Sequence, residues 1–431
     1  MDLELKIENF GPIDKATIRV GQFTVFAGPN NTGKTFVAKM LYSILSAMNA
    51  NHARVFFDSI ARHIESDLQR FEQSGRVIEE RPLSVIRRGL QKIDSILKEA
   101  FPSHPLQNEL DRLKAVQPAL MAEIEEIKGH SGTSETYIGI LEENFRNVEL
   151  AIDFGRHLKF SQNLHGNFQV PDFSNLRGDG DSPLYFSFEG VAEFRETEEE
   201  SFEFTPSPLI IQYVQSFSEA FYLESPLYWK LKSALESIKL DSRSPFGSSL
   251  NGVPDYFYDM AVALRRRRIE HPFAEIHTSL HDAIGGQILL SEAGDLEFQQ
   301  KGKSIPLSLT SAGVANMGML ALLIERGALD RGSFLFIDEP ESNLHPAWQV
   351  EMAAFLFELA RQGVNVVIST HSMTILKWLE VHVKEKPEDR EFVRLNKFPP
   401  DAEWNDDMDA VMAEVKQSLT KPFSDLYIKG L

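Results

Sequence analysis

The segment GPNNTGKT, residues 28–35, has the residue types and the spacing of a phosphate-binding loop. Its glycines let consecutive backbone N–H groups curl round a phosphate, and Lys34 can reach the β- and γ-phosphate oxygens of a nucleoside triphosphate. The Thr35 hydroxyl can be a ligand of Mg²⁺. The candidate nucleotide-binding residues are Gly28, Asn30, Asn31, Thr32, Gly33, Lys34, Thr35 and Phe36.

Paired carboxylates follow an apolar run in a second segment, FLFIDEPESNLHP, residues 334–346. The four apolar residues predict a central strand that is buried on both faces, and α/β sheets place their ligand crevices at the C-terminal ends of such strands. We expect Asp338 to hold Mg²⁺ through water and Glu339 to polarise the attacking water. The alternative is an ordinary acidic strand end.

A histidine ends a third apolar segment, VNVVISTHS, residues 364–372. Between this segment and the carboxylates, Pro346 and Gly363 are placed where a helix begins and ends. The resulting βαβ unit brings Asp338 and His371 to neighbouring strand ends. His371 can then hydrogen-bond a γ-phosphate or orient the water, although a lone histidine can also have a structural role.

A Ser-Ala-Gly turn opens an apolar helix in a fourth segment, LSLTSAGVANMGMLALLIERG, residues 307–327. Taken alone, the turn is only a helix start with Thr310 or Ser311 as the N-cap. Its place just before the paired-carboxylate strand indicates that the turn does more than start a helix.

The remaining elements must position these residues. Residues 1–27 alternate as strands do, and residues 34–48 have helical spacing. Residues 165–212 are predicted as strands, among them NFQV and LIIQYV, whereas residues 213–285 are predicted as helical. We expect an α/β fold with four parts: an ATPase core (1–50 and 285–375), a helical insertion (51–160), a β-rich and then helical lobe (161–284) and a C-terminal extension (376–431).

Apolar residues recur at helical spacing through the insertion, at Ile86, Leu90, Ile93 and Leu97 and again from residue 106 to 127, with a break at Gln117. FPSHP, residues 101–105, suits a turn between two helices. We expect a hairpin or small bundle reaching about 35 Å. Either it is a packed subdomain or it is an arm that grips a partner.

Composition narrows the range of functions. There are 44 Lys and Arg against 63 Asp and Glu, a net charge of −19, so general coating of nucleic acid is disfavoured. The chain has no cysteine, which excludes disulfides and thiolate metal sites. No signal peptide and no apolar run of membrane-spanning length is apparent, and we expect a cytoplasmic protein without membrane contact.

In this order, the four segments resemble those of ABC-type ATPases, specifically the soluble branch that includes OLD-, RecF- and SMC-like proteins. GPNNTGKT is similar to the Walker A motif, FLFIDEPE to Walker B with its catalytic glutamate, SNLHP to the D-loop and STHS to the H-loop. The resemblance covers about residues 1–50 and 285–375. It implies a P-loop NTPase fold with an antiparallel β subdomain.

The resemblance also implies cofactors and partners. ATP and Mg²⁺ would lie between Lys34 of one subunit and the signature residues Ser311, Ala312 and Gly313 of another, in a dimer bridged by ATP. Glu339 and His371 would serve hydrolysis. OLD proteins continue into a TOPRIM nuclease domain, and we recognise no such acidic cluster after His371. We therefore expect a separate effector such as a nuclease or toxin, in bacterial antiviral defence.

Alternatives stay open at this point. A RecF- or SMC-like DNA-maintenance ATPase would need a basic patch, for which the candidates are Arg265, Arg266, Arg267 and Arg268. A scaffold that binds ATP without hydrolysing it is a third class. Ala312 and Val314 depart from the signature of transporters. Gln212 is the candidate Q-loop residue, and Phe10 and Phe23 are candidates for stacking on adenine.

Overall fold

The computed structural model describes residues 2–73, 80–101, 109–130, 134–197, 202–207, 217–224, 226–232, 235, 253–265, 272–291 and 294–428. The chain divides into two compact units. The first contains residues up to 43, 164–241 and the chain from 249 on, and the second consists mainly of residues 44–163.

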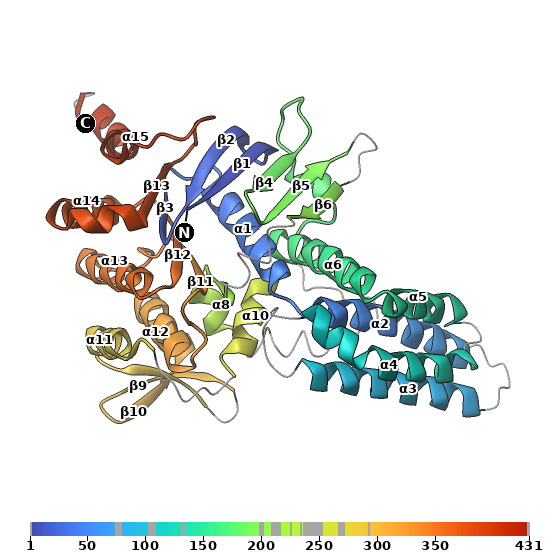
Figure 1. Cartoon of the computed structure of the whole chain (residues 1–431). Coiled ribbons are helices and arrows are strands. Elements are labelled where there is room, and N and C mark those ends of the chain that lie inside the picture. The colour runs from blue at the N-terminus through green and yellow to red at the C-terminus, as the bar shows by residue number, and fades with distance from the viewer. Residues whose placement is uncertain are drawn as a thin grey trace. The chain divides into compact units, whose positions relative to one another are not determined.

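A five-stranded parallel sheet forms the centre of the first unit (Figure 1). Its strands are β3 (Phe23–Ala27), β7 (Ala220–Leu223), β11 (Phe334–Asp338), β12 (Asn365–Thr370) and β13 (Val393–Lys397), in the order β13-β3-β12-β11-β7. Every residue of β3 and β12 is buried. Sheets covered on both faces need such continuous apolar strands, and the predicted α/β fold class is confirmed.

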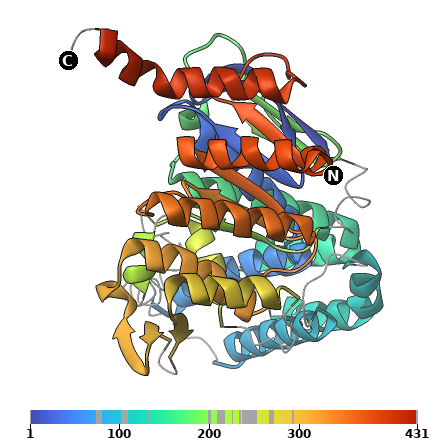
Figure 2. The ribbon, with the colours of Figure 1, turned by 90° about the vertical axis from the view of Figure 1, so that its left-hand side faces the viewer.

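Four helices follow strands of this sheet: α1 (Lys34–Met48) after β3, α13 (Pro346–Arg361) after β11, α14 (Met373–Glu385) after β12 and α15 (Met408–Ile428) after β13. A further helix, α12 (Ala312–Glu325), precedes β11. Figure 2 shows α13, α14 and α15, coloured orange to red, side by side. Pro346 occupies the first turn of α13, and His345 caps it by accepting a hydrogen bond from the Ala347 N–H. The shorter helices α8 (Pro226–Lys230), α10 (Asp255–Ala263) and α11 (Ala274–Ile284) complete this set.

Two antiparallel sheets accompany the parallel one. The larger has the order β2-β1-β4-β5-β6, with β1 (Leu3–Phe10), β2 (Ile13–Val20), β4 (Tyr185–Phe188), β5 (Ala192–Glu196) and β6 (Phe202–Pro206). The smaller contains β8 (Gln287–Leu290), β9 (Leu296–Gln300) and β10 (Lys303–Pro306). The antiparallel β subdomain expected from the sequence is therefore present.

Some of the predicted elements are wrong. NFQV is not a strand, because α6 continues to Phe168 and a turn follows. Residues 220–223, within a region predicted as helical, form the edge strand β7 of the parallel sheet. LIIQYV lies outside the described residues.

The second unit is built from helices around one apolar core. They are α2 (His52–Gln73), α3 (Glu80–Ala100), α4 (Glu109–Lys128), α5 (Glu135–Arg146) and most of α6 (Val148–Phe168). The core includes Ile86, Ile93, Leu120 and Phe145, so the predicted apolar spacing marks the buried helix faces. At the break in that spacing, the Gln117 side-chain amide donates to the carbonyl oxygens of Phe145 and Arg146 at the end of α5.

No helix in the described part of the chain combines the length and the apolar character that crossing a membrane requires.

Candidate functional site

The carboxyl ends of three neighbouring strands bring the predicted chemistry together. β12 lies between β3 and β11, with Thr370 paired to Ala27 and Ser369 paired to Asp338. The Gly28 N–H donates to the Thr370 carbonyl at 3.3 Å, and the Glu339 N–H donates to the Ser369 carbonyl at 2.8 Å. The loop at 28–35, the paired carboxylates and His371 consequently meet at one edge of the sheet.

The backbone of the loop at 28–35 passes through left-handed conformations. Asn31 has a φ of 62° and Gly33 a φ of 95°, in the region that favours glycine. A Cβ atom on Gly33 would come within 2.9 Å of the Ile13 side chain, and one on Gly28 within 2.0 Å of the Phe398 carbonyl oxygen. Glycine at these two positions therefore lets the loop pack closely against its neighbours.

Lys34 is buried within this loop, with 6% of its surface exposed. Its Nζ donates to the carbonyl oxygens of Gly28, at 2.9 Å, and Pro29, at 2.5 Å. Burial lowers the pKa of Lys34, and the carboxylates of Asp338, Glu339 and Glu341 act in the opposite direction. The ammonium is thus a desolvated cation inside the loop, which strengthens its attraction to phosphate.

Thr35 and Asp338 offer two oxygen ligands side by side. The Thr35 hydroxyl donates to Asp338 Oδ2 at 2.8 Å. Burial raises the pKa of Asp338 to about 6, and this outweighs the lowering effect of the Thr35 hydrogen bond. A carboxylate that is costly to ionise and a hydroxyl beside it suit Mg²⁺, which prefers hard oxygen ligands. When bound there, the ion would neutralise charge on the phosphate oxygens.

Replacing Asp338 with Asn should stabilise the ligand-free protein while abolishing Mg²⁺-dependent ATP hydrolysis. The folded-state pKa of about 6 exceeds the ordinary 3.8, so the folded state binds more protons between these values and wild-type stability falls as pH rises through this window. We expect the variant to gain about 3 kcal/mol at pH 7.5 and nothing below about pH 4. Urea unfolding without Mg²⁺ at several pH values measures the difference. An unchanged or lower stability of the variant at pH 7.5 would contradict this account.

Glu339 is half-exposed and held by two partners. Its backbone has a φ of 51°. The Ser342 hydroxyl donates to Glu339 Oε2 at 3.0 Å, and His371 Nδ1 lies 3.2 Å from Glu339 Oε1. The carboxylate is therefore oriented and still open to water, as a general base requires.

Glu341 is a further site residue that the sequence interpretation missed. It is buried, and its Oε1 accepts from the Thr370 hydroxyl at 2.7 Å and from the His371 N–H at 2.9 Å. The same oxygen lies 3.4 Å from His371 Nδ1. Glu341 thus fixes the turn that carries His371. The sequence did contain a signal for Glu341, because it is the third acidic residue of the segment DEPE, residues 338–341.

Glu224 was missed as well. Because β7 runs parallel to β11 with Leu223 opposite Ile337, Glu224 emerges beside Asp338 and contributes to raising the pKa of Asp338. Lys39 Nζ lies 3.2 Å from Glu224 Oε1, and the Tyr256 hydroxyl donates to Glu224 Oε2. Gln212, the candidate Q-loop residue, lies outside the described residues.

The turn at residues 310–313 lies on the surface. The Ser311 hydroxyl caps α12 by accepting from the Val314 N–H at 3.2 Å, so Ser311 is the N-cap. Behind it, a Cβ on Gly313 would come within 2.8 Å of the Asn343 carbonyl oxygen. The turn is therefore packed on the segment that follows the paired carboxylates, with Ala312 half-buried and Leu309 76% exposed beside it.

Neither proposed adenine-stacking residue is accessible. Phe10 and Phe23 are 0% and 1% exposed. Phe10 packs edge-on against Phe36, a candidate nucleotide-binding residue, at a centroid distance of 5.5 Å. Phe23 packs against Phe357 of α13 at 5.2 Å. Because both rings are enclosed in the protein interior, the stacking role is wrong for both Phe10 and Phe23.

The basic patch is only partly described. Arg265 lies just beyond the end of α10. Arg266, Arg267 and Arg268 lie outside the described residues.

Comparison with known proteins identifies two matching family models. One, described as "AAA ATPase domain", matches residues 1–222, and the other, described as "AAA domain, putative AbiEii toxin, Type IV TA system", matches residues 153–377. A search of curated protein sequences found no match.

Solved structures of SMC head domains are similar to the chain. An SMC head bound to the C-terminal winged-helix domain of ScpA has a TM-score of 0.40 at 11% identity, with 88% of this chain and 91% of that chain covered. For the SMC head domain from Thermotoga maritima the TM-score is 0.36 at 12% identity, with 88% and 92% covered. For a Pyrococcus furiosus SMC head with an extended coiled coil it is 0.31 at 13% identity, with 90% and 99% covered.

Proposed function

The chain belongs to the AAA ATPase domain family, and from this premise we propose that it is an ABC-type ATPase that hydrolyses ATP within a head-to-tail dimer and thereby regulates a separate effector protein. One observation carries the proposal. A buried lysine, a hydroxyl–carboxylate pair and an oriented glutamate meet at the carboxyl ends of β3, β11 and β12.

Each of these groups has a role in ATP hydrolysis. Lys34 would bind the β- and γ-phosphate oxygens, and Thr35 and Asp338 would hold Mg²⁺ beside them. Glu339 accepts a proton from the attacking water, and the Ser342 hydroxyl and His371 fix the direction of its carboxylate. Glu341 keeps His371 at this edge through the backbone N–H of His371. The loop cradle and the paired carboxylates support catalysis rather than binding alone.

The position of the signature turn supports a shared site. Ser311 begins a 14-residue helix whose N-terminus faces outward, and such an N-terminus attracts the negative charge of a phosphate. The neighbouring Leu309 is an apolar side chain left exposed on the same turn. A second subunit that docks its ATP against this turn would cover both features. ATP then acts as a ligand that favours the dimer, and hydrolysis releases it.

The proposal of a separate effector is supported by the description of one matching family model. One matching model is described with a putative toxin of a type IV toxin–antitoxin system. A regulatory ATPase that holds a toxin or nuclease partner in one nucleotide state and releases it in the other is consistent with that description. The proposed setting is bacterial antiviral defence.

Complementation between two inactive variants tests whether the site is shared. In a head-to-tail dimer, mixing Lys34→Ala with Ser311→Arg creates one site with an intact loop and an intact signature turn. Each variant alone should show less than about 1% of wild-type phosphate release, because loss of an electrostatic contact to the reacting phosphate costs at least 100-fold. The mixture should recover up to about a quarter of wild-type activity, since random pairing makes half of the dimers mixed, each with one working site of two.

The matched control is Ser311→Thr, which retains a hydroxyl N-cap for α12 and should stay close to wild type alone. If the mixture remains as inactive as its components while both variants are folded, the shared site is wrong. Retained activity of Ser311→Arg alone would also exclude it.

A further inference from the structure

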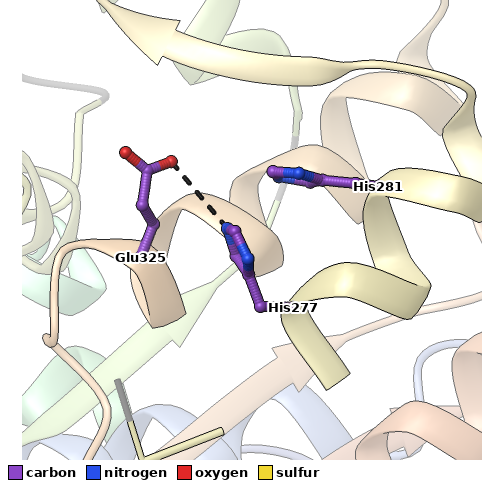
Figure 3. A group of neighbouring side chains, drawn as sticks. All are labelled: His277, His281 and Glu325. Atoms are coloured by element: carbon purple, nitrogen blue, oxygen red, sulfur yellow. Dashed lines mark ion pairs between the residues drawn. The ribbon is translucent and has the colours of Figure 1, made fainter. Parts of the chain in front are cut away.

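Two histidines and a glutamate converge away from the nucleotide site. His277 and His281 lie one turn apart on α11, and Glu325 is the last residue of α12. Figure 3 shows the three side chains pointing toward one another across the two helices. Residues four apart project from the same face of a helix, which places both imidazoles toward α12.

The helices that carry this cluster are closely packed. A Cβ atom on Gly318 of α12 would come within 2.4 Å of the Ile288 side chain on β8, and within 3.4 Å of Ile284 at the end of α11. At Gly318, α12 is therefore packed closely against β8 and the end of α11. The three side chains are partly buried.

Donor atoms of the three residues already lie near one another. One ligand atom from each lies within 4.8 Å of the others. His277 Nε2 is 3.9 Å from Glu325 Oε2, and the two imidazole centroids are 4.1 Å apart with the rings inclined by 57°. Among the described residues this is the group of His, Asp and Glu side chains that meets the geometry of a metal site.

Two of these atoms have unmet hydrogen-bonding capacity. His281 Nε2 and Glu325 Oε2 are both buried and neither has a hydrogen-bond partner. Buried polar atoms are rarely left in this condition. An imidazole nitrogen in this condition has a lone pair that it can offer to a metal ion.

We propose that His277, His281 and Glu325 bind Zn²⁺, with water as the fourth ligand. Two imidazoles and one carboxylate are a ligand set that Zn²⁺ accepts, whereas Mg²⁺ and Ca²⁺ prefer oxygen ligands alone. Zn–N and Zn–O distances of about 2.0–2.2 Å in a tetrahedral site separate ligand atoms by about 3.4 Å. Small side-chain rotations bring the observed 3.9 Å to that value without moving either helix.

The site would connect α11 to the signature helix. Glu325 ends α12, and Ser311 caps the start of the same helix. The ion would therefore clamp the C-terminal end of the helix whose N-terminus carries the signature turn. Its binding requires neither ATP nor the carboxylates of the nucleotide site, so this inference stands independently of the proposed function.

Metal titration of the full-length chain tests the proposal. Protein dialysed against a chelator, without nucleotide, is titrated with Zn²⁺ by calorimetry and with Co²⁺ by visible absorption. We expect one ion per chain, tetrahedral Co²⁺ bands, and a higher melting temperature with Zn²⁺. His281→Gln and Glu325→Gln should each weaken Zn²⁺ binding by at least about 100-fold, since even residues that only support metal ligands contribute 10- to 100-fold. His157→Gln, a change at an exposed histidine of α6, should bind as wild type does.

Failure to bind Zn²⁺, or equal binding by the wild type and both variants, would overturn the proposal and leave an ordinary ion pair between α11 and α12. If the variants do not fold, chemical modification of wild-type histidines by diethyl pyrocarbonate decides. Zn²⁺ must then protect His277 and His281 and leave His157 reactive. Unprotected His277 and His281 would overturn the proposal equally.

Discussion

Glu339→Gln is expected to lower the rate of ATP hydrolysis by about 100- to 10,000-fold, the range that a positioned general base contributes. The amide has the size of the carboxylate and still accepts the hydrogen bond from the Ser342 hydroxyl, but it cannot accept a proton from water. ATP binding should persist because Lys34, Thr35 and Asp338 are unchanged. Steady-state phosphate release and equilibrium ATP binding measure the two effects separately.

The same variant should lengthen the life of the ATP-bound dimer, since hydrolysis is the step that ends it. Light scattering with ATP would detect a dimer that persists in the variant and decays in the wild type. An effector that prefers the ATP-bound dimer would stay bound to this variant. The variant is therefore also suitable for capturing the effector by affinity purification. Glu351→Gln, a change at an exposed glutamate of α13, is the matched control. Wild-type turnover in Glu339→Gln would remove Glu339 from the role of base.

Much of the nucleotide site could be predicted because its motifs lie next to regular elements. Asp338 follows a continuous apolar strand, and Pro346 and Gly363 delimit the helix that leads to His371. A βαβ unit has little topological freedom, so Asp338 and His371 necessarily come together. The start of α12 could be predicted from the N-cap preference of serine and threonine, although the choice between Thr310 and Ser311 stayed open.

Other features of the site depend on long-range pairing that no local pattern reveals. β7 has only four residues, AFYL, and becomes a strand because β11 supplies its hydrogen-bond partners. Because the sequence did not predict this strand, it gave no indication that Glu224 lies beside Asp338. Glu341 was overlooked for a similar reason, because its partners Thr370 and His371 lie about thirty residues away along the chain.

The stacking roles proposed for Phe10 and Phe23 are wrong because both side chains are buried. Both residues alternate correctly for strands, but the sequence does not show which face of a strand is covered. Phe10 lies within a cluster of rings that includes Phe36, Phe168 and Phe186. Aromatic residues close to a phosphate-binding loop are thus as well suited to supporting the loop as to contacting the base.

Lys34→Ala is expected to weaken ATP binding by about 100-fold or more and to leave no measurable hydrolysis. The lysine is a buried cation that can make two charge-assisted hydrogen bonds to phosphate, each contributing about 1.5–3 kcal/mol. Its removal also leaves Asp338, Glu339 and Glu341 without the ammonium that faces them, and their negative charge then opposes the phosphates. Equilibrium ATP binding measures the loss, and the melting temperature verifies the fold. Lys384→Ala, at an exposed lysine of α14, is the matched control.

The comparison of Lys34→Ala with Glu339→Gln separates binding from hydrolysis. Both variants should lack turnover, yet their behaviour with ATP should be opposite. Glu339→Gln should accumulate as a dimer, whereas Lys34→Ala should remain in the state that the wild type adopts without nucleotide. If the two variants show the same association state in ATP, the nucleotide does not bridge the subunits. In that event the exposed Ser311 turn must serve a different contact, even if Lys34 and Glu339 bind and hydrolyse ATP as expected.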